Sequence, residues 1–407
     1  MKENFRCCLL MAAYFSLNCV ALCYAFLFLN ERGLSVDGIG ILVAVSCLAS
    51  AVLQGVAGRL ADSRHLFSWK NQLIFESVIV AALMALLLIF PAKPASALLY
   101  SLVIVFTLIM MPMVNSACFS YTESGAKVNF GLVRGIGSLF FALASLVTGK
   151  MVASMGYLIV PKIGILIGLL MMGAALLMPR TEPVSQNTDS PAPHKSAIRE
   201  FFEFGSMYPA FAIMAAAIAM TLILQGMVNT FFIDIIRPIG GDAGAMGIAI
   251  AIAAASEIPV MFLYSKIEGR FGLGSDKLIA ISCGFYVLRG ILYMMVAGMT
   301  GIYSIQLLQG LSYGLQAPAK ANYAYQTVDR RCLSTGQAVM SGTDVIGTVI
   351  GSMLGGFLLG RFGLGTMLLT GTILAAVGTV LAVSQSFGFR IGKRRAYLTS
   401  WKDKETC

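Results

Sequence analysis

Long apolar stretches recur along the chain and are separated by short polar segments. Twelve such stretches begin near residues 7, 36, 71, 96, 131, 157, 207, 243, 277, 301, 336 and 365. Each extends over about 20 residues, the length at which an α-helix crosses the hydrocarbon core of a bilayer with its backbone hydrogen bonds satisfied internally. The pattern therefore predicts an all-α integral membrane protein with twelve transmembrane helices.

The composition and the distribution of charge agree with this prediction. Hydrophobic residues make up 58% and charged residues 12% of the 407 positions, whereas charged residues make up about 25% of an average soluble domain. If both termini are cytoplasmic, 22 of the 29 Lys and Arg lie in cytoplasmic segments, six lie in outer loops, and Arg289 lies within a span. Because basic residues accumulate on the cytoplasmic side of membranes, the net charge of +10 indicates topology and not nucleic-acid binding.

The chain divides into two halves of six spans each. Residues 1–179 and 206–386 form the halves, 180–205 is expected to be a cytoplasmic linker, and 387–407 a basic cytoplasmic tail. Three glycines of the first half recur 207 residues later in the second: Gly40 and Gly247, Gly149 and Gly356, and Gly156 and Gly363. This constant offset indicates a duplicated six-span unit. Transporters built from parallel repeats place their substrate site between the two halves.

Among the ionisable residues that hydropathy places within the membrane, the most informative are Arg134, near the inner end of its span, and Glu257, Arg289 and Asp344. A charge at the bilayer centre costs ~3 kcal/mol on insertion scales, so such residues usually face protein or water and mark a function. Arg134, near the start of its span, either faces a cavity or extends to the head groups. Glu257 is a candidate proton carrier with Arg289 as its cation, and the alternative is a purely structural ion pair. Asp344 has no basic partner in its own span, so it is neutral, pairs with Arg134 or Arg289, or binds a cation. We expect Glu257, Arg289 and Asp344 to form a proton-coupling network.

Amide side chains on several spans suggest a polar organic ligand. Asn115, Gln225, Asn229 and Gln309 are expected to bind it together with Arg134, although each amide alone also suits an interhelical hydrogen bond. The sequence has no G-x-x-x-x-G-K-[ST] loop, no G-x-G-x-x-G and no H-E-x-x-H motif. We therefore expect no enzyme activity, no cofactor and no metal site, so that uphill transport would need an ion gradient or a partner subunit.

Five segments carry motifs that can be compared with known families: LNERGLSVDGIG at 29–40, QGVAGRLAD at 54–62, FGLVRGIGS at 130–138, SEIPVMF at 256–262, and Leu-Arg at 288–289. Together they resemble the major facilitator superfamily over nearly the whole chain. They are most similar to its lactose permease-like group, which includes oligosaccharide and phenylpropionate proton symporters. The resemblance implies the major facilitator fold, a substrate contact at Arg134, and a gate motif at Gly58, Asp62 and Arg64.

The chain departs from this group at the proton relay. Where the lactose permease pattern has a histidine and a glutamate, this chain has Gln309 and Ser312. Ser116 falls near the position where the lactose permease pattern has an acidic residue that partners the arginine of span 5. Asp344 aligns with a lysine of that pattern. If coupling survives, Glu257 and Asp344 are the remaining candidates, and galactoside specificity is not implied.

These observations predict an alternating-access transporter with one site between its halves. We expect proton-coupled symport of a small polar organic solute, with sugars or oligosaccharides as the first choice. The alternatives are uniport or efflux of an aromatic acid or amphiphile and, in a different class, a transporter-like sensor. The expected partners are the small-molecule substrate, a proton or other cation, and the lipid bilayer. We expect a monomer that spans a bacterial plasma membrane several times, with both termini in the cytoplasm.

Overall fold

The computed structural model describes residues 2–63, 69–123, 130–178, 204–329 and 332–387, and these residues form helices joined by short turns, with no strand among them. The all-α prediction is confirmed. Within the described ranges, eleven helices are long and apolar enough to cross a membrane. Their starts agree with the predicted spans to within a few residues.

The first half contributes the first six predicted spans. Its opening span is continuous but changes from an α-helix to a π-helix and, after Tyr24, back to an α-helix. The elements are α1 (Lys2–Asn18), η1 (Cys19–Cys23), α2 (Ala25–Glu31), α3 (Val36–Ser63), α4 (Trp69–Ile89), α5 (Lys93–Glu123), α6 (Phe130–Met155) and α7 (Ile159–Leu177).

The second half contributes five uninterrupted spans and one interrupted span. Its elements are α9 (Pro209–Thr230), α10 (Phe232–Ile236), η3 (Arg237–Ile239), α11 (Ala243–Phe271), α12 (Ser275–Met295), α13 (Met299–Leu307), η4 (Gly310–Gly314), α14 (Leu315–Thr327), α15 (Leu333–Phe362) and α16 (Leu364–Ser386). The span predicted to begin near residue 301 is therefore made of α13, η4 and α14 in succession. π-Helical turns inside helices often mark functional sites, and this one separates Gln309 from Lys320.

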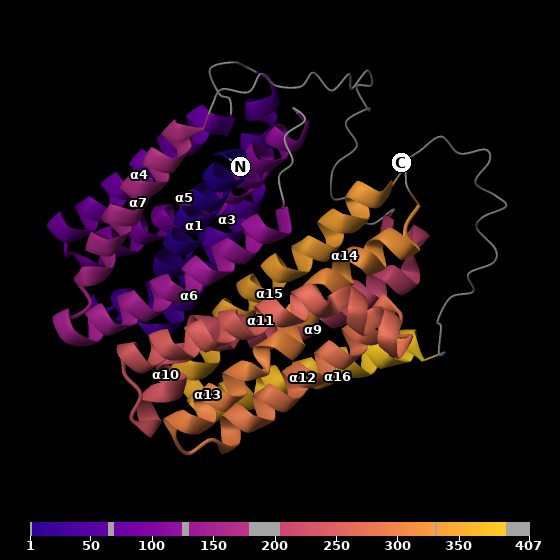
Figure 1. Ribbon diagram of the computed structural model, residues 1–407. Helices are drawn as coiled ribbons and strands as arrows, with labels where there is room; N and C mark the ends of the chain where they lie inside the picture. The colour runs from indigo at the N-terminus through magenta and orange to yellow at the C-terminus, as the bar shows by residue number, and fades with distance from the viewer. Residues whose placement is uncertain (1, 64–68, 124–129, 179–203, 330–331, 388–407) are drawn as a thin grey trace.

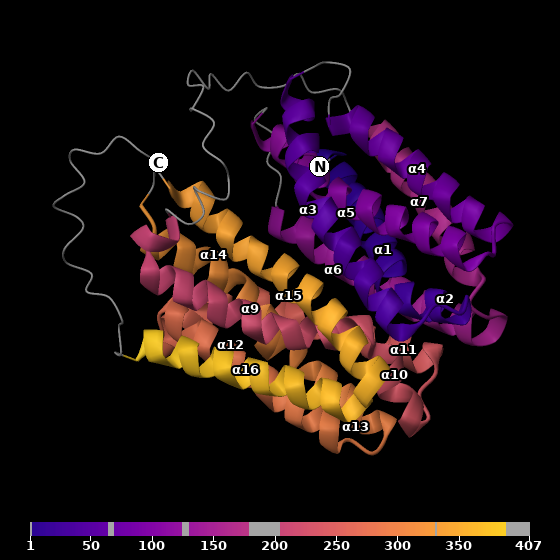
Figure 2. The ribbon, with the colours of Figure 1, turned by 180° about the vertical axis from the view of Figure 1, so that it is seen from behind.

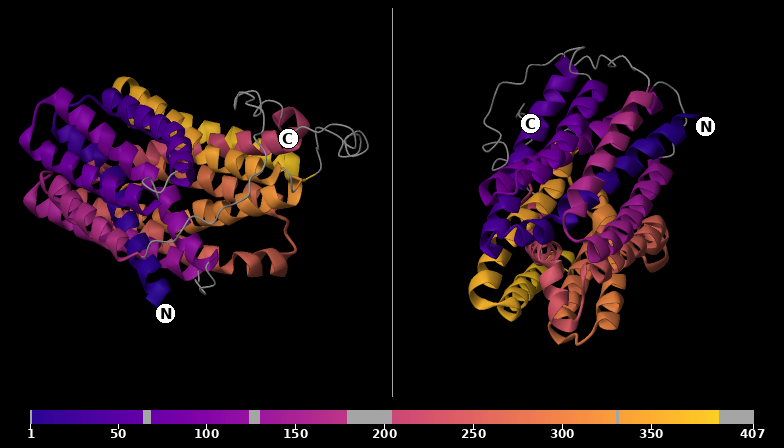
Figure 3. Two further views of the ribbon diagram at one scale, coloured as in Figure 1. Left: turned by 90° about the horizontal axis from the view of Figure 1, so that it is seen from above. Right: turned by 90° about the vertical axis from the view of Figure 1, so that its left-hand side faces the viewer.

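The helices form two bundles that lie against one another (Figure 1). The bundles converge at the end that carries α2 and α10, which we call the closed end, and they diverge toward the end where α14 finishes and α15 begins, which we call the open end (Figure 2). The side and top views of Figure 3 show the same division between the indigo-to-magenta helices and the orange-to-yellow helices. Two helix pairs join the bundles: α3 lies against α15, and α6 against α11.

Each of these two crossings depends on a pair of glycines. A Cβ atom on Gly40 of α3 would lie 2.3 Å from the carbonyl oxygen of Ser352 and 3.2 Å from the Cα of Gly356. A Cβ atom on Gly247 of α11 would lie 2.5 Å from the carbonyl oxygen of Ser145 and 3.1 Å from the Cα of Gly149. Glycine lets helix backbones approach this closely because it has no side chain. The closed end is therefore sealed by backbone against backbone.

The two crossings are equivalent under the sequence repeat. Gly40 and Gly149 belong to the first half, and the glycines that they meet, Gly356 and Gly247, are their counterparts in exchanged order at the offset of 207 residues. The third repeated pair, Gly156 and Gly363, occupies the turns after α6 and α15 with φ of 79° and 84°. A glycine in each turn is favoured because other residues are strained at positive φ. The structure thus gives the repeated glycines matching roles.

Two polar contacts also join the halves at the closed end. The hydroxyl of Ser145 donates to the carbonyl oxygen of Gly247 at 3.0 Å. Arg237 pairs with Glu31 of the other half at 3.3 Å and with Asp234 of its own half at 3.4 Å. The predicted linker, 180–205, and the predicted tail, 387–407, fall almost entirely outside the described residues, so their boundaries stay predictions.

Candidate functional site

A buried arginine on α12 is the centre of the most extensive polar cluster of the described residues. Arg289 is 3% exposed, and no carboxylate in the described part of the chain lies within ion-pair distance of it. Five neutral acceptors from α9, α12 and the interrupted span of α13 and η4 surround its guanidinium group: Gln225 at 2.9 Å, Gln309, Ser312 at 3.0 Å, Tyr293 at 3.2 Å and Gln306 at 3.4 Å. The two terminal nitrogens of the guanidinium group make all of these contacts, so the cluster holds its positive charge in a fixed place.

Glu257 joins this cluster through an amide rather than directly. Gln309 accepts a hydrogen bond from Arg289 through its Oε1 atom, and its Nε2 atom donates to Glu257 at 2.9 Å. The alternative of a direct Glu257–Arg289 ion pair is therefore wrong, because the Gln309 amide lies between the two charges. Gln309 can bridge them because its side chain offers both a donor and an acceptor.

The backbone explains why Glu257 and Gln309 meet. A Cβ atom on Gly314 of η4 would lie 3.1 Å from the Cα of Glu257, and one on Gly310 would lie 2.4 Å from the carbonyl oxygen of Ser256. The two glycines therefore let η4 rest directly on α11 at the level of Glu257. The hydroxyl of Ser256 also accepts from the backbone N–H of Gly310 at 3.0 Å.

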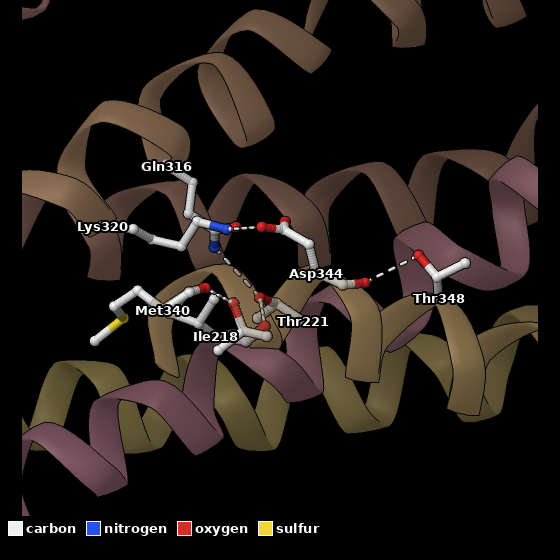
Figure 4. A network of polar contacts seen from close by, with 8 residues as sticks. Ile218, Thr221, Gln316, Lys320, Met340, Asp344 and Thr348 are labelled. Atoms are coloured by element: carbon white, nitrogen blue, oxygen red, sulfur yellow. Dashed lines mark hydrogen bonds and ion pairs between the residues drawn. The ribbon is translucent and has the colours of Figure 1, made fainter. Parts of the chain in front are cut away.

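Asp344 has a basic partner that the sequence did not reveal. Its Oδ2 atom lies 2.6 Å from the Nζ atom of Lys320 on α14 (Figure 4). The proposed pairings of Asp344 with Arg134 or Arg289 are therefore wrong in this structure. Lys320 was counted among the basic residues of cytoplasmic segments because it lies near the end of a predicted span. The structure instead buries its side chain to 6% exposure, while 38% of the Asp344 side chain stays exposed.

A second amide lies beside this ion pair. Gln316, one turn before Lys320 on α14, donates to the hydroxyl of Thr221 on α9 at 3.4 Å (Figure 4). The Oε1 atom of Gln316 and the Oδ1 atom of Asp344 are both buried and accept no hydrogen bond. Buried acceptors are usually satisfied, so this cluster has room for further donors.

Arg134 lies on α6, which packs against α11 of the second half. It is half-buried, its guanidinium carbon lies 4.5 Å from the centre of the Phe15 ring, and no carboxylate of the described side chains is within ion-pair distance. Tyr313 of η4 lies beside the Asp344 cluster, with the Nζ atom of Lys320 6.0 Å from its ring centre.

The expected amides divide into two groups. Gln225 and Gln309 both bind Arg289, and Gln225 also donates to the exposed Asn229 at 2.9 Å. Asn115 on α5 is half-buried and its buried Oδ1 atom has no hydrogen-bond partner, so the structure does not bring it into either cluster.

The expected gate residues cannot be placed in the same way. Gly58 and Asp62 lie in α3, in a stretch whose side chains are not described, and Arg64 lies outside the described residues. Their role stays a prediction.

Comparison with known proteins identifies the family. The sequence model of the MFS_1 like family, a family of the major facilitator superfamily, matches residues 7–369. The chain belongs to this family. It is a multi-pass membrane transporter, and its family and relatives are transporters rather than enzymes.

Two curated relatives are similar over most of the chain. The maltose permease of Geobacillus stearothermophilus is 26% identical over 365 residues, which are 86% of each chain. The uncharacterized transporter YwbF of Bacillus subtilis (strain 168) is 24% identical over 306 residues, which are 75% of this chain and 73% of YwbF.

Solved structures show the same fold at low identity. The nucleoside transporter NupG has a TM-score of 0.78 and 16% identity, and the match covers 96% of this chain and 100% of NupG. An auto-inhibited peptide transporter of the POT family has a TM-score of 0.73 and 12% identity, covering 97% of this chain and 98% of that one. The major facilitator fold expected from the sequence motifs is thus confirmed.

Proposed function

We propose that this transporter carries a small polar organic solute by proton-coupled symport, with sugars and oligosaccharides as the first choice. The observation that carries the coupling proposal is the chain of contacts from Glu257 through Gln309 to Arg289. It places a titratable carboxylate and a buried cation in one network without the direct ion pair that would hold them together. The name of the maltose permease, a relative over 86% of the chain, supports the choice of sugars.

In the proposed mechanism the coupling proton binds to Glu257. Protonation removes the negative charge that balances Arg289 through the Gln309 amide, so the network must rearrange or gain hydrogen bonds from the substrate. The solute would bind between Arg134 on α6 and the amide side chains of the second half. Asp344 was expected to share the coupling role, but it pairs with Lys320 and not with the Arg289 network, so we assign the proton to Glu257.

Alternating access would follow from rocking of the two bundles about the bound solute. In the proposed topology both termini are cytoplasmic, the closed end faces outward, and the protein works as a monomer in a plasma membrane. The glycine crossings of α3 with α15 and α6 with α11 would then separate when the outer side opens.

A second candidate function is uniport or efflux of an aromatic acid. It is favoured by Arg134, which stacks on Phe15 and meets no carboxylate of the described side chains within ion-pair distance, so that an acidic solute would supply a counter-charge. A transporter-like sensor, which binds a solute without moving it, is the candidate from a different class.

Proton uptake in energised vesicles would distinguish these functions. Maltose, other neutral sugars, nucleosides and aromatic acids would each be added to vesicles that contain the wild type or the Glu257→Gln variant. Alkalinisation that follows a sugar pulse and is lost in the variant would support symport with the proton on Glu257. Solute entry without a pH change in either protein would contradict the coupling, and binding without flux would favour the sensor.

A further inference from the structure

We propose that Asp344, positioned by Lys320, forms a subsite that accepts hydrogen bonds from the hydroxyl groups of a neutral carbohydrate. The inference rests on the proposed function and specifies which chemistry the second half recognises. It starts from the one ion pair that the described residues form inside the spans, Lys320 with Asp344 at 2.6 Å.

The two members of this pair differ in exposure in a way that defines their roles. The Lys320 side chain is 6% exposed and the Asp344 side chain 38%. A solute therefore reaches the carboxylate and not the ammonium group. Lys320 acts from behind, as a positioning residue that contacts Oδ2. Because Oδ1 is buried, Oδ2 is the carboxylate oxygen that a solute reaches.

Lys320 also supplies the counter-charge of Asp344. Removing one partner of a buried ion pair leaves the other charge uncompensated, which is strongly unfavourable. Among the described residues, Lys320 is the cation within ion-pair distance of Asp344. Tyr313 on η4 lies next to the pair, with the Nζ atom of Lys320 6.0 Å from its ring centre.

An ionised carboxylate is an acceptor only, and it binds O–H donors more strongly than a neutral acceptor does. The Oδ1 atom of Asp344 and the Oε1 atom of Gln316 are buried and accept no hydrogen bond, so two acceptors without a donor lie beside Oδ2, the exposed oxygen. The site is thus rich in acceptors and lacks donors to fill them. Tyr313 adds an aromatic surface next to the ion pair.

The same pair disfavours charged solutes. An anionic solute would meet the exposed carboxylate of Asp344, and a cationic solute would bring a second positive charge toward Lys320 and compete for its only counter-ion. A neutral solute with several hydroxyl groups meets neither obstacle. The pair therefore favours a sugar over the aromatic acid of the second candidate function.

The test is a thermodynamic cycle that combines substitutions in the protein with removal of single hydroxyl groups from the ligand. Counterflow in proteoliposomes would give the apparent affinity for maltose and for each of its monodeoxy derivatives, first in the wild type. The primary variant is Lys320→Met/Asp344→Asn, which removes both charges and so leaves no uncompensated ion in the span. Asp344→Asn alone is the second variant. Lys277→Met is the matched control, because Lys277 stacks on the Phe387 ring and lies outside both clusters.

In the wild type, at least one deoxy derivative should bind roughly 10- to 100-fold more weakly than maltose, the effect expected for a hydrogen bond to a charged group. The double variant should bind maltose roughly 10- to 100-fold more weakly than the wild type does. It should also bind maltose and the affected deoxy derivative equally well. Lys277→Met should behave as the wild type. The same deoxy penalty in the wild type and the double variant would overturn the subsite and leave sugar transport standing. Failure of the wild type to carry any neutral sugar would overturn both, and sugar transport without proton movement would contradict only the coupling.

Discussion

The glycine crossings at the closed end give the most direct prediction about conformation. A Cβ atom at Gly40 would lie 2.3 Å from the carbonyl oxygen of Ser352, about 1 Å inside the ordinary van der Waals contact that begins at 3.4 Å. The symmetry-related atom at Gly247 would lie 2.5 Å from the carbonyl oxygen of Ser145. In both cases the obstructing atom is backbone, so it cannot turn aside as a side chain would. The variant Gly40→Ala/Gly247→Ala therefore forces α3 from α15 and α11 from α6.

The size of the effect follows from the overlap. Overpacking of this kind typically costs ~1–3 kcal/mol at each site. The two crossings share no residues, so their effects should add to ~2–6 kcal/mol. Alternative conformations of a protein commonly differ by a few kcal/mol. We therefore expect the double variant to populate mainly a state in which the closed end is open, and each single variant to shift the populations partway.

Distances between spin labels would measure this shift. Labels at the exposed residues Ala92 and Thr366, one on each half at the closed end, would be introduced after replacement of the native cysteines. The double variant should add a longer distance that the wild type lacks. Gly284→Ala is the matched control, because no atom lies within 4 Å of its added Cβ. An unchanged distance distribution in the double variant would refute the conclusion that these contacts hold the end closed.

Three further predictions concern single side chains. Arg289→Met leaves five acceptors without their shared donor, so we expect the free energy of unfolding to fall by about 3 kcal/mol or more. The measurement is the thermal unfolding midpoint in detergent, which should decrease. An unchanged midpoint would show that the cluster does not stabilise the fold. Gln309→Leu keeps the side-chain volume but removes both hydrogen bonds of the bridge between Arg289 and Glu257. Uphill accumulation of the solute should therefore fall about tenfold or more while counterflow persists. Parallel loss of both activities would indicate a binding defect instead. Burial raises the pKa of Asp234 above its ordinary value of 3.8, although Arg237 opposes the shift. The folded state therefore favours the protonated carboxyl group. The stability of the fold falls as the pH rises from the ordinary pKa through the raised pKa. Asp234→Asn should therefore raise the unfolding midpoint at pH 7 and leave it unchanged below the ordinary pKa, and a gain of equal size at both pH values would contradict this assignment.

The spans were predictable because each one depends on a simple local pattern. An apolar stretch of about 20 residues has few options other than to cross the membrane as a helix. The repeat at 207 residues was equally visible, and the structure gave its glycines matching contacts. The interruption of the tenth span was not predicted, because hydropathy averages over a window and does not detect a change from α- to π-helix at Gly310.

The side-chain partners were less predictable, since they depend on helix rotation and on contacts between distant segments. Glu257 and Arg289 were recognised as neighbours, but the amide of Gln309 between them was assigned to the substrate. Lys320 was overlooked because a lysine about seven residues from the end of a span resembles one that extends to the head groups. Only its packing against α15 shows that it neutralises Asp344 within the protein.

The exchanged order of the glycine pairs gives the interface between the two halves a two-fold symmetry. Gly40 meets the counterpart of Gly149, and Gly149 meets the counterpart of Gly40. A surface on which patch A contacts patch B while B contacts A is isologous, as in a two-fold symmetric homodimer. Each half therefore carries a surface complementary to a copy of itself. The interface that closes this transporter therefore has the two-fold symmetry of a homodimer of six-helix units, although both units belong to one chain.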